Sequence, residues 1–268
     1  MPINEKTVMK KPRLHWVKEG QGPMVVLSHA LGCDISMWDG VAALLASRYT
    51  VLRYDHRGHG RSQAPAGLYN LAMLADDAAS LITEQAAGPV HFVGLSMGGM
   101  TAQALAAAQP QLLKSVVIAN AASWYDEAAR AMWQARVDTV LAQGVAAIAD
   151  GALQRWFTPE FRADVAGGGA QRVAALRLQL EKTDAAAYAA SCEAVAQIDF
   201  RTSNRRIRCP ALVLAGTRDE ATPLAMSEAI CHSIEGAQLR TLDAAHLSAV
   251  EQPEAFAQLL EGFFDSVR

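Results

Sequence analysis

The stretch VHFVGLSMGG at residues 90–99 decides the fold. It reads as a short apolar strand, a tight turn and the start of a helix, with Ser96 at the centre of a G-x-S-x-G motif. Such a turn is sharp and strained because it must project the serine hydroxyl from the edge of a sheet. Gly94 and Gly98 then stand where larger side chains would collide, and Gly99 lets the helix pack closely. The motif predicts that Ser96 is a nucleophile; a purely structural glycine-rich turn is the alternative.

Short runs rich in valine and leucine recur along the chain on both sides of this motif. Runs of this kind are typical of strands that are buried on both faces. Strands are predicted at residues 24–27, 49–54, 91–93, 115–119, 211–215 and 238–242. Alanine-rich stretches with helical spacing predict helices at residues 38–47, 71–85, 97–108 and 253–264. Strands that alternate with helices indicate an α/β protein with a mostly parallel sheet flanked by helices.

The alternation stops over residues 123–206, where no convincing strand occurs. Helices are predicted there at residues 128–143, 145–156 and 170–182, and Gly167-Gly168-Gly169 is predicted to form a loop or hinge between two of them. We therefore expect a core made of residues 1–122 and 207–268. The helical insertion of residues 123–206 is expected to form a lid over the active edge of the sheet.

Composition excludes several classes of protein. Of 268 residues, 51% are hydrophobic and 19% are charged, which argues against a disordered chain. The formal net charge of −3 leaves no basic surplus for a phosphate backbone, so nucleic acid is not an expected partner. The four cysteines form no C-x-x-C pair, which argues against a zinc site or a disulfide framework. No apolar run approaches the roughly 20 residues that cross a membrane, and the first 16 residues lack the apolar segment of a signal peptide. A cytoplasmic protein is expected.

A serine hydroxyl is a poor nucleophile without a general base. With this motif the chain order is serine, then acid, then histidine. His246 follows the last predicted strand and is the expected base, and Asp219 follows the strand before it and is expected to orient the imidazole. The rival positions for the acid are Asn120, after the preceding strand, and Asp243. Asp243 is only three residues from His246 and is poorly placed to reach back.

An oxyanion hole requires two backbone N–H groups. Met97 follows the nucleophile and is predicted to supply one, and Leu31, in the loop after residues 24–27, is predicted to supply the other. His29 in the same loop is expected to hold it by hydrogen bonds, with a catalytic role as the alternative. The histidine- and arginine-rich loop of residues 55–62 contains no phosphate-binding glycine motif. It is expected to pack beside the active site rather than to bind metal or phosphate.

Together these motifs resemble a known family, the α/β hydrolases that open 3-oxoadipate enol-lactone in aromatic catabolism. The resemblance rests on YDHRGHGRS at residues 54–62, FVGLSMGGMT at 92–101, DAAHLSAVEQP at 243–253, RWFTP at 155–159 and ASCEA at 190–194. It implies the α/β-hydrolase fold and a serine hydrolase that opens a lactone or ester through an acyl-enzyme, without metal or organic cofactor. The His29-Ala30 pair and the charges of Arg218 and Glu220 depart from the family pattern and bear on the substrate, not on the chemistry.

The resemblance also implies a substrate-binding pair in the lid. Trp133 and Arg136 are three residues apart on a predicted helix and so share a face. Similar residues stand at this place in the lactonases, and arginine suits a planar carboxylate. The alternative is that Trp133 packs the underside of the lid and Arg136 is solvated.

The expected partner is a small-molecule lactone or ester, and a homo-oligomer is left open. The alternatives within the fold are a carboxylesterase, another lactonase or a perhydrolase. A ligand receptor with little turnover is the alternative of another class, and the intact motif around Ser96 argues against it.

Overall fold

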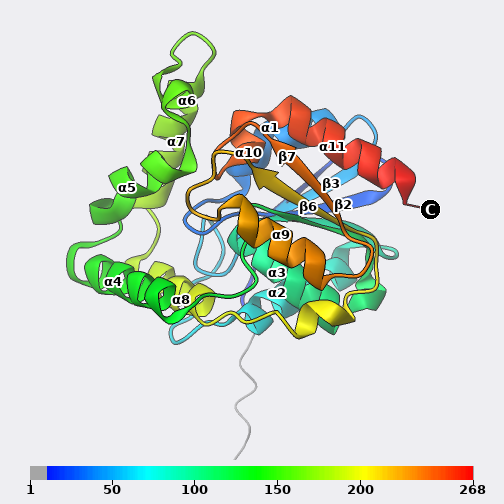
Figure 1. Ribbon diagram of the computed structural model, residues 1–268, viewed down its shortest axis with the longest axis horizontal. Coiled ribbons are helices and arrows are strands. Elements are labelled where there is room, and N and C mark those ends of the chain that lie inside the picture. The colour runs from blue at the N-terminus through cyan, green and yellow to red at the C-terminus, as the bar shows by residue number, and fades with distance from the viewer. Residues whose placement is uncertain (1–10, 268) are drawn as a thin grey trace, which may run out of the picture.

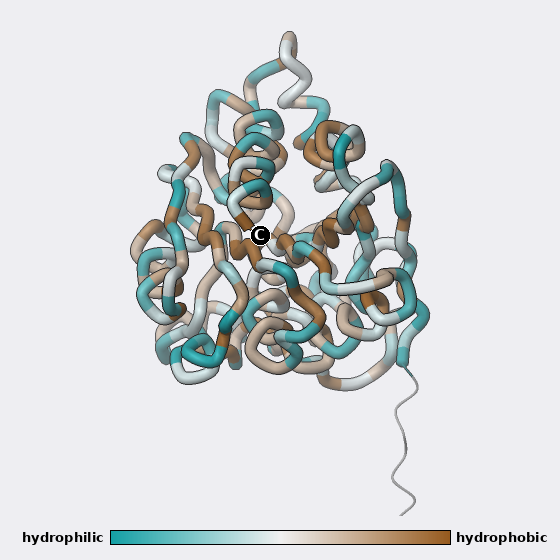
Figure 2. Tube along the Cα trace, turned by 90° about the vertical axis from the view of Figure 1, so that its right-hand side faces the viewer, coloured by the Kyte–Doolittle hydropathy of each residue, from teal (hydrophilic) through white to brown (hydrophobic). Residues whose placement is uncertain are grey.

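The computed structural model describes residues 11–267. The first ten residues, on which the expectation about a signal peptide partly rests, lie outside this range. Within it, no helix combines the length and apolar character needed to cross a membrane. Figure 2 shows hydrophobic segments running through the middle of the molecule and hydrophilic segments along its outside, as the composition of a globular chain leads one to expect.

A seven-stranded sheet forms the middle layer, with strand order β1-β3-β2-β4-β5-β6-β7 (Figure 1). The strands are β1 (Trp16–Glu19), β2 (Met24–Ser28), β3 (Thr50–Tyr54), β4 (Val90–Leu95), β5 (Leu113–Ala119), β6 (Ala211–Gly216) and β7 (Gln238–Leu242). β1 pairs antiparallel with β3, and the remaining pairs are parallel. The predicted α/β fold is thereby confirmed, with each predicted strand present. β1 went unpredicted because it is a short, charged edge strand that is buried on neither face.

The two faces of the sheet carry separate apolar cores. Successive residues of a strand point to opposite faces. In β2, Val25 and Leu27 therefore pack into one hydrophobic cluster, whereas Val26 packs into the other. Because both faces are covered, the central strands read as continuous apolar runs in the sequence.

Helices cover both faces of the sheet (Figure 1). α1 (Asp39–Leu45) and α11 (Pro253–Ser266) pack together on one face, and α2 (Leu71–Gln85), α3 (Met97–Ala108) and α9 (Leu224–Ser233) lie on the other. The short helix α10 (Ser248–Glu251) precedes α11, and single 3₁₀ turns η1 (Ile35–Trp38), η2 (Pro110–Leu112) and η3 (Ser203–Arg206) connect other elements.

Five helices separate β5 from β6 and stand beside the sheet layers in Figure 1. They are α4 (Glu127–Gln143), α5 (Ala146–Trp156), α6 (Pro159–Ala163), α7 (Gly169–Glu181) and α8 (Ala185–Ala196). Over residues 123–206 the described chain forms no strand, only an isolated bridge between Trp124 and Asp199. Gly168 adopts a left-handed conformation (φ 87°) immediately before α7, which accounts for a glycine in the loop between α6 and α7.

Candidate active site

Ser96 lies in the turn between β4 and α3, with φ 57° and ψ −117°. Positive φ is uncommon for a residue other than glycine and marks strained backbone that the surroundings must hold in place. A Cβ atom on Gly94 would overlap the carbonyl oxygen of Gly98, and one on Gly98 would overlap the carbonyl oxygen of Ser28. Gly98 is thus required by the end of β2, a contact that the sequence did not reveal.

Three loops bring Ser96, His246 and Asp219 together at one edge of the sheet. Nε2 of His246 lies 2.9 Å from Oγ of Ser96, and Nδ1 of His246 lies 2.9 Å from Oδ2 of Asp219. The loops follow β4, β7 and β6. The carboxyl ends of neighbouring parallel strands share one edge, so residues distant in sequence meet there. His246 and Asp219 are buried and Ser96 is half-buried, which leaves its hydroxyl open to the adjacent cavity.

Both carboxylate oxygens of Asp219 accept hydrogen bonds. Oδ1 accepts from the N–H groups of Ala221 (2.8 Å) and Thr222 (2.9 Å), and Oδ2 accepts from Oγ1 of Thr222 (2.6 Å) and Nδ2 of Asn120 (3.0 Å). Burial alone would raise the pKa of Asp219. The charge and hydrogen bond of His246, with the bonds from Thr222 and Asn120, outweigh burial and lower that pKa to about 2. Asp219 is therefore ionised at neutral pH.

The rival acid, Asp243, is exposed and lies away from the imidazole. Its Oδ1 faces Oγ1 of Thr217 at 3.4 Å, and it makes no hydrogen bond to His246. Asn120, at the other rival position, is in direct contact with Asp219.

The loop that carries His246 is held by Glu251, a contact that sequence reasoning missed. The Glu251 carboxylate accepts from the N–H groups of Ala245 (2.7 Å) and Thr158 (2.5 Å). The N–H group of Leu247 donates to the carbonyl oxygen of Trp156 (3.0 Å). These bonds join the histidine loop to the chain after α5, so the helical segment and the sheet edge are fixed to each other at this point.

The two N–H groups predicted to form an oxyanion hole are free of backbone partners. Met97 is the first residue of α3, and the first N–H groups of a helix have no acceptor within it. Leu31 follows β2 in an irregular loop. Among residues 11–267, neither N–H donates to a backbone carbonyl. Both groups are therefore available to a ligand oxygen.

A cavity of about 340 Å³ adjoins Ser96 and His246. Trp133 and Arg136 of α4 line it, so the structure brings the predicted pair to the same cavity as Ser96. The Arg136 guanidinium carbon lies 5.1 Å from the centre of the Trp133 ring, and Nη1 is 3.5 Å from the Tyr188 hydroxyl. No described carboxylate forms an ion pair with Arg136. Its charge is thus available to an anion in the cavity.

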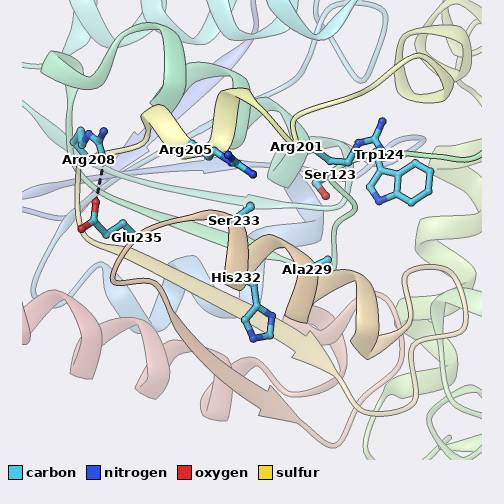
Figure 3. Close-up of a pocket in the computed structure, with 9 residues that line it drawn as sticks. All are labelled: Ser123, Trp124, Arg201, Arg205, Arg208, Ala229, His232, Ser233 and Glu235. Atoms are coloured by element: carbon cyan, nitrogen blue, oxygen red, sulfur yellow. Dashed lines mark hydrogen bonds and ion pairs between the residues drawn. The ribbon is translucent and has the colours of Figure 1, made fainter.

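A larger hollow of about 650 Å³ lies elsewhere, beside α9 and η3 (Figure 3). None of the nine residues that line it belongs to the group around Ser96. Its cations are largely neutralised, since Arg208 pairs with Glu235 (3.1 Å) and Arg201 pairs with Asp199 (2.6 Å). The larger volume of this hollow therefore does not make it the active site. The smaller cavity at Ser96 is the candidate active site.

The sequence profile of a family described as alpha/beta hydrolase fold matches residues 23–253. The chain belongs to the alpha/beta hydrolase fold family and is a hydrolase.

Its relatives include lactonases and esterases. 3-Oxoadipate enol-lactonase 2 of Acinetobacter baylyi is 38% identical over 250 residues, which cover 92% of this chain and 91% of that protein. The crystal structure of the enol-lactonase from Burkholderia xenovorans LB400 has a TM-score of 0.90 at 35% identity, covering 96% of this chain and 98% of that one. A thermophilic esterase from Thermogutta terrifontis, solved with malate bound, has a TM-score of 0.88 at 27% identity, covering 96% and 94%. The resemblance to enol-lactonases inferred from the motifs is thereby confirmed.

Proposed function

We propose that the chain is a serine hydrolase that opens 3-oxoadipate enol-lactone in aromatic catabolism, with Ser96, His246 and Asp219 as its catalytic triad. One observation carries the proposal. The hydrogen bonds run without a break from Ser96 through His246 to an ionised Asp219, beside a cavity lined by Arg136, which forms no ion pair with a described carboxylate. The enol-lactonase relatives, which match over most of their length, support the choice of substrate.

The geometry fits nucleophilic catalysis. Ser96 Oγ attacks the lactone carbonyl carbon while His246 Nε2 accepts its proton, and Asp219 stabilises the imidazolium that forms. The N–H groups of Leu31 and Met97 receive the negative charge of the tetrahedral oxygen. The ring C–O bond then breaks, His246 returns the proton to the departing enol oxygen, and the opened substrate stays on Ser96 as an ester. A water molecule deprotonated by His246 hydrolyses that ester and regenerates the serine. No metal or organic cofactor takes part in these steps.

The helices of residues 123–206 act, in this proposal, as a lid that binds the rest of the substrate. The enol-lactone has a free carboxylate on its side arm, and burying this anion without a partner would be costly. Arg136 lies in the cavity without a carboxylate partner and can form charge-assisted hydrogen bonds to it. Trp133 packs against the guanidinium and holds it in place.

An esterase without a preference for anionic substrates is the competing function, and the esterase relative at 27% identity favours it. Values of kcat/KM for 3-oxoadipate enol-lactone, a neutral lactone of the same ring size and p-nitrophenyl acetate separate the two. We expect kcat/KM for the enol-lactone to exceed that for the neutral lactone by at least about 100-fold. A site built to bind a charged group discriminates against a substrate that lacks this group. Equal values for the two lactones would leave a general esterase or lactonase. Binding without turnover of any of the three would indicate a receptor.

A further inference from the structure

His29 stands two residues before Leu31 and contacts the peptide group that carries the Leu31 N–H. The carbonyl oxygen of Ala30 lies 2.8 Å from Nδ1 of His29 and also accepts from the N–H group of Cys33 (3.1 Å). In a planar trans peptide the C=O and the following N–H point in opposite directions. The bonds that fix the Ala30 carbonyl therefore fix the direction of the Leu31 N–H as well.

The hydrogen bonds of His29 determine which ring nitrogen carries the proton. Nε2 of His29 accepts from the backbone N–H of His56 (2.9 Å), and that N–H can only donate. Nε2 is therefore unprotonated, and the proton of the neutral ring is on Nδ1, from which it is donated to the Ala30 oxygen. His29 is fully buried, and burial lowers its pKa although the charge of Asp55 opposes this, so the neutral ring persists at neutral pH.

The partner of His29 is itself held in a buried polar network. Nε2 of His56 lies 2.8 Å from Oγ of Ser28, and that hydroxyl lies 2.9 Å from the Tyr54 hydroxyl. Ser28 ends β2, and its carbonyl oxygen is the atom that the Gly98 backbone approaches. The end of β2 thus positions both the loop that contains Leu31 and the start of α3, where Met97 lies.

We propose that His29 is a positioning residue of the oxyanion hole, fixing the Ala30–Leu31 peptide so that its N–H points at the oxygen that becomes charged. This inference rests on the proposed function. This role differs from filling space, because it depends on the hydrogen-bond donor at Nδ1 of His29. A hydrogen bond received by a peptide oxygen also polarises the same peptide and strengthens its N–H as a donor.

Two substitutions separate the two ends of the ring. In His29→Asn, the amide nitrogen replaces Nδ1 and keeps the donor to Ala30, but the acceptor for the His56 N–H is lost. In His29→Gln, the amide reaches the position of Nε2 and keeps that acceptor, but the donor to Ala30 is lost. Both variants remove the imidazole, so a space-filling role predicts similar effects for both.

The test measures kcat and KM with p-nitrophenyl acetate and the Ki of phenylboronic acid, which forms a tetrahedral adduct on the serine. Loss of a whole oxyanion donor costs about 10²–10³ in kcat, so a misdirected donor in His29→Gln should cost about 10–100-fold, with KM nearly unchanged and Ki weaker by a similar factor. His29→Asn should keep kcat within about fivefold of wild type. A kcat of His29→Gln equal to wild type, or equal losses in both variants, overturns the proposal.

A measurement on the unmodified protein tests the same claim if the glutamine variant does not fold. The ¹⁵N chemical shifts of His29 should show the proton on Nδ1, and a proton on Nε2 would contradict the proposal. Failure of the proposed serine mechanism looks different, since wild type would then show neither turnover of p-nitrophenyl acetate nor labelling of Ser96 by a fluorophosphonate. An active, labelled wild type with an unaffected His29→Gln refutes only the role of His29.

Discussion

Asn120 donates a hydrogen bond from Nδ2 to Oδ2 of Asp219 across 3.0 Å, although 99 positions separate the two residues in sequence. Asn120 also accepts from Oγ of Ser248 (2.6 Å) and has a positive φ of 46°. The same Asp219 oxygen faces Nδ1 of His246. Asn120 therefore connects the loop after β5 to the acid and to the helix that follows the histidine, and it helps to hold the carboxylate in place.

The identity of the triad acid can be tested with two matched substitutions. Asp219→Asn should lower kcat by about 10⁴, because an amide in place of the carboxylate favours the wrong imidazole tautomer and does not stabilise the imidazolium. Asp243→Asn, the same change at an exposed carboxylate three residues before His246 in the sequence, should leave kcat within about twofold of wild type. Steady-state kinetics on p-nitrophenyl acetate gives both values. A larger loss in Asp243→Asn than in Asp219→Asn would show that the acid is misassigned.

Substrate charge should be recognised by Arg136. In Arg136→Ala, kcat/KM for the anionic lactone should fall by about 10–100-fold, mainly through KM, because a hydrogen bond to a charged group contributes about 1.5–3 kcal/mol. The same variant should hydrolyse p-nitrophenyl acetate as wild type does. Arg205→Ala removes an exposed arginine from the hollow beside η3 and serves as the control. Equal losses on both substrates in Arg136→Ala would contradict the assignment.

Gly98, two residues after the nucleophile, should tolerate no side chain. Gly98→Ala places a methyl group against the Ser28 carbonyl oxygen, so we expect either no folded protein or a loss of several kcal/mol in the free energy of unfolding. Gly262→Ala, within α11, meets no atom within 4 Å and should raise that free energy by up to about 1 kcal/mol. Urea unfolding compares the two. A Gly98→Ala protein as stable as wild type would show that the strand and the turn do not pack as described.

The free energy of unfolding should fall as pH is lowered below neutrality, because a buried imidazole must then be kept neutral. Burial, aided by the charge of Lys114, lowers the pKa of His91 to about 4, below the ordinary value of about 6.5 in an unfolded chain. As pH falls from about 6.5 to 4, the unfolded chain takes up the proton first, so the contribution of the neutral ring is full above this window and is lost within it. Near pH 5 this one group should add about 1.4 kcal/mol per pH unit to the slope of the unfolding free energy.

The variant His91→Asn should lower that slope by about this amount. Urea unfolding at intervals between pH 4.5 and 7 measures it. An unchanged slope would mean that His91 is protonated in the folded protein, against its burial and its hydrogen bond with Ser115.

The sequence predicted the sheet and the triad because both depend on local signals. The buried parallel strands are continuous apolar runs, and Ser96 directly follows one of them, whereas Asp219 and His246 lie in the short loops after β6 and β7. The end of a strand fixes where the following loop begins. Residue type and position in the sequence were therefore sufficient to predict these three residues. The fold and the family resemblance are confirmed, and the roles of the three residues remain a prediction.

The supporting contacts could not be read from the sequence because they join distant segments. Glu251 bonds to Thr158 across 93 positions, and nothing near either residue signals the pair. From the sequence, Asn120 is only a rival position for the acid, whereas in the structure it contacts that acid. The helices α6 and α8 were also not delimited. α6 has only five residues, and α8 is apolar on most sides and lacks the periodicity that marks a helix with one exposed face.

The central claim is that the hydroxyl of Ser96 is the nucleophile, and the turnover rate of Ser96→Ala tests it most directly. Removing Oγ deletes the atom that forms the acyl-enzyme and leaves the cavity, His246 and the two N–H groups in place. The account predicts that kcat on p-nitrophenyl acetate falls by about 10⁴–10⁶ relative to wild type. A folded Ser96→Ala protein that keeps a tenth of the wild-type rate would contradict the account.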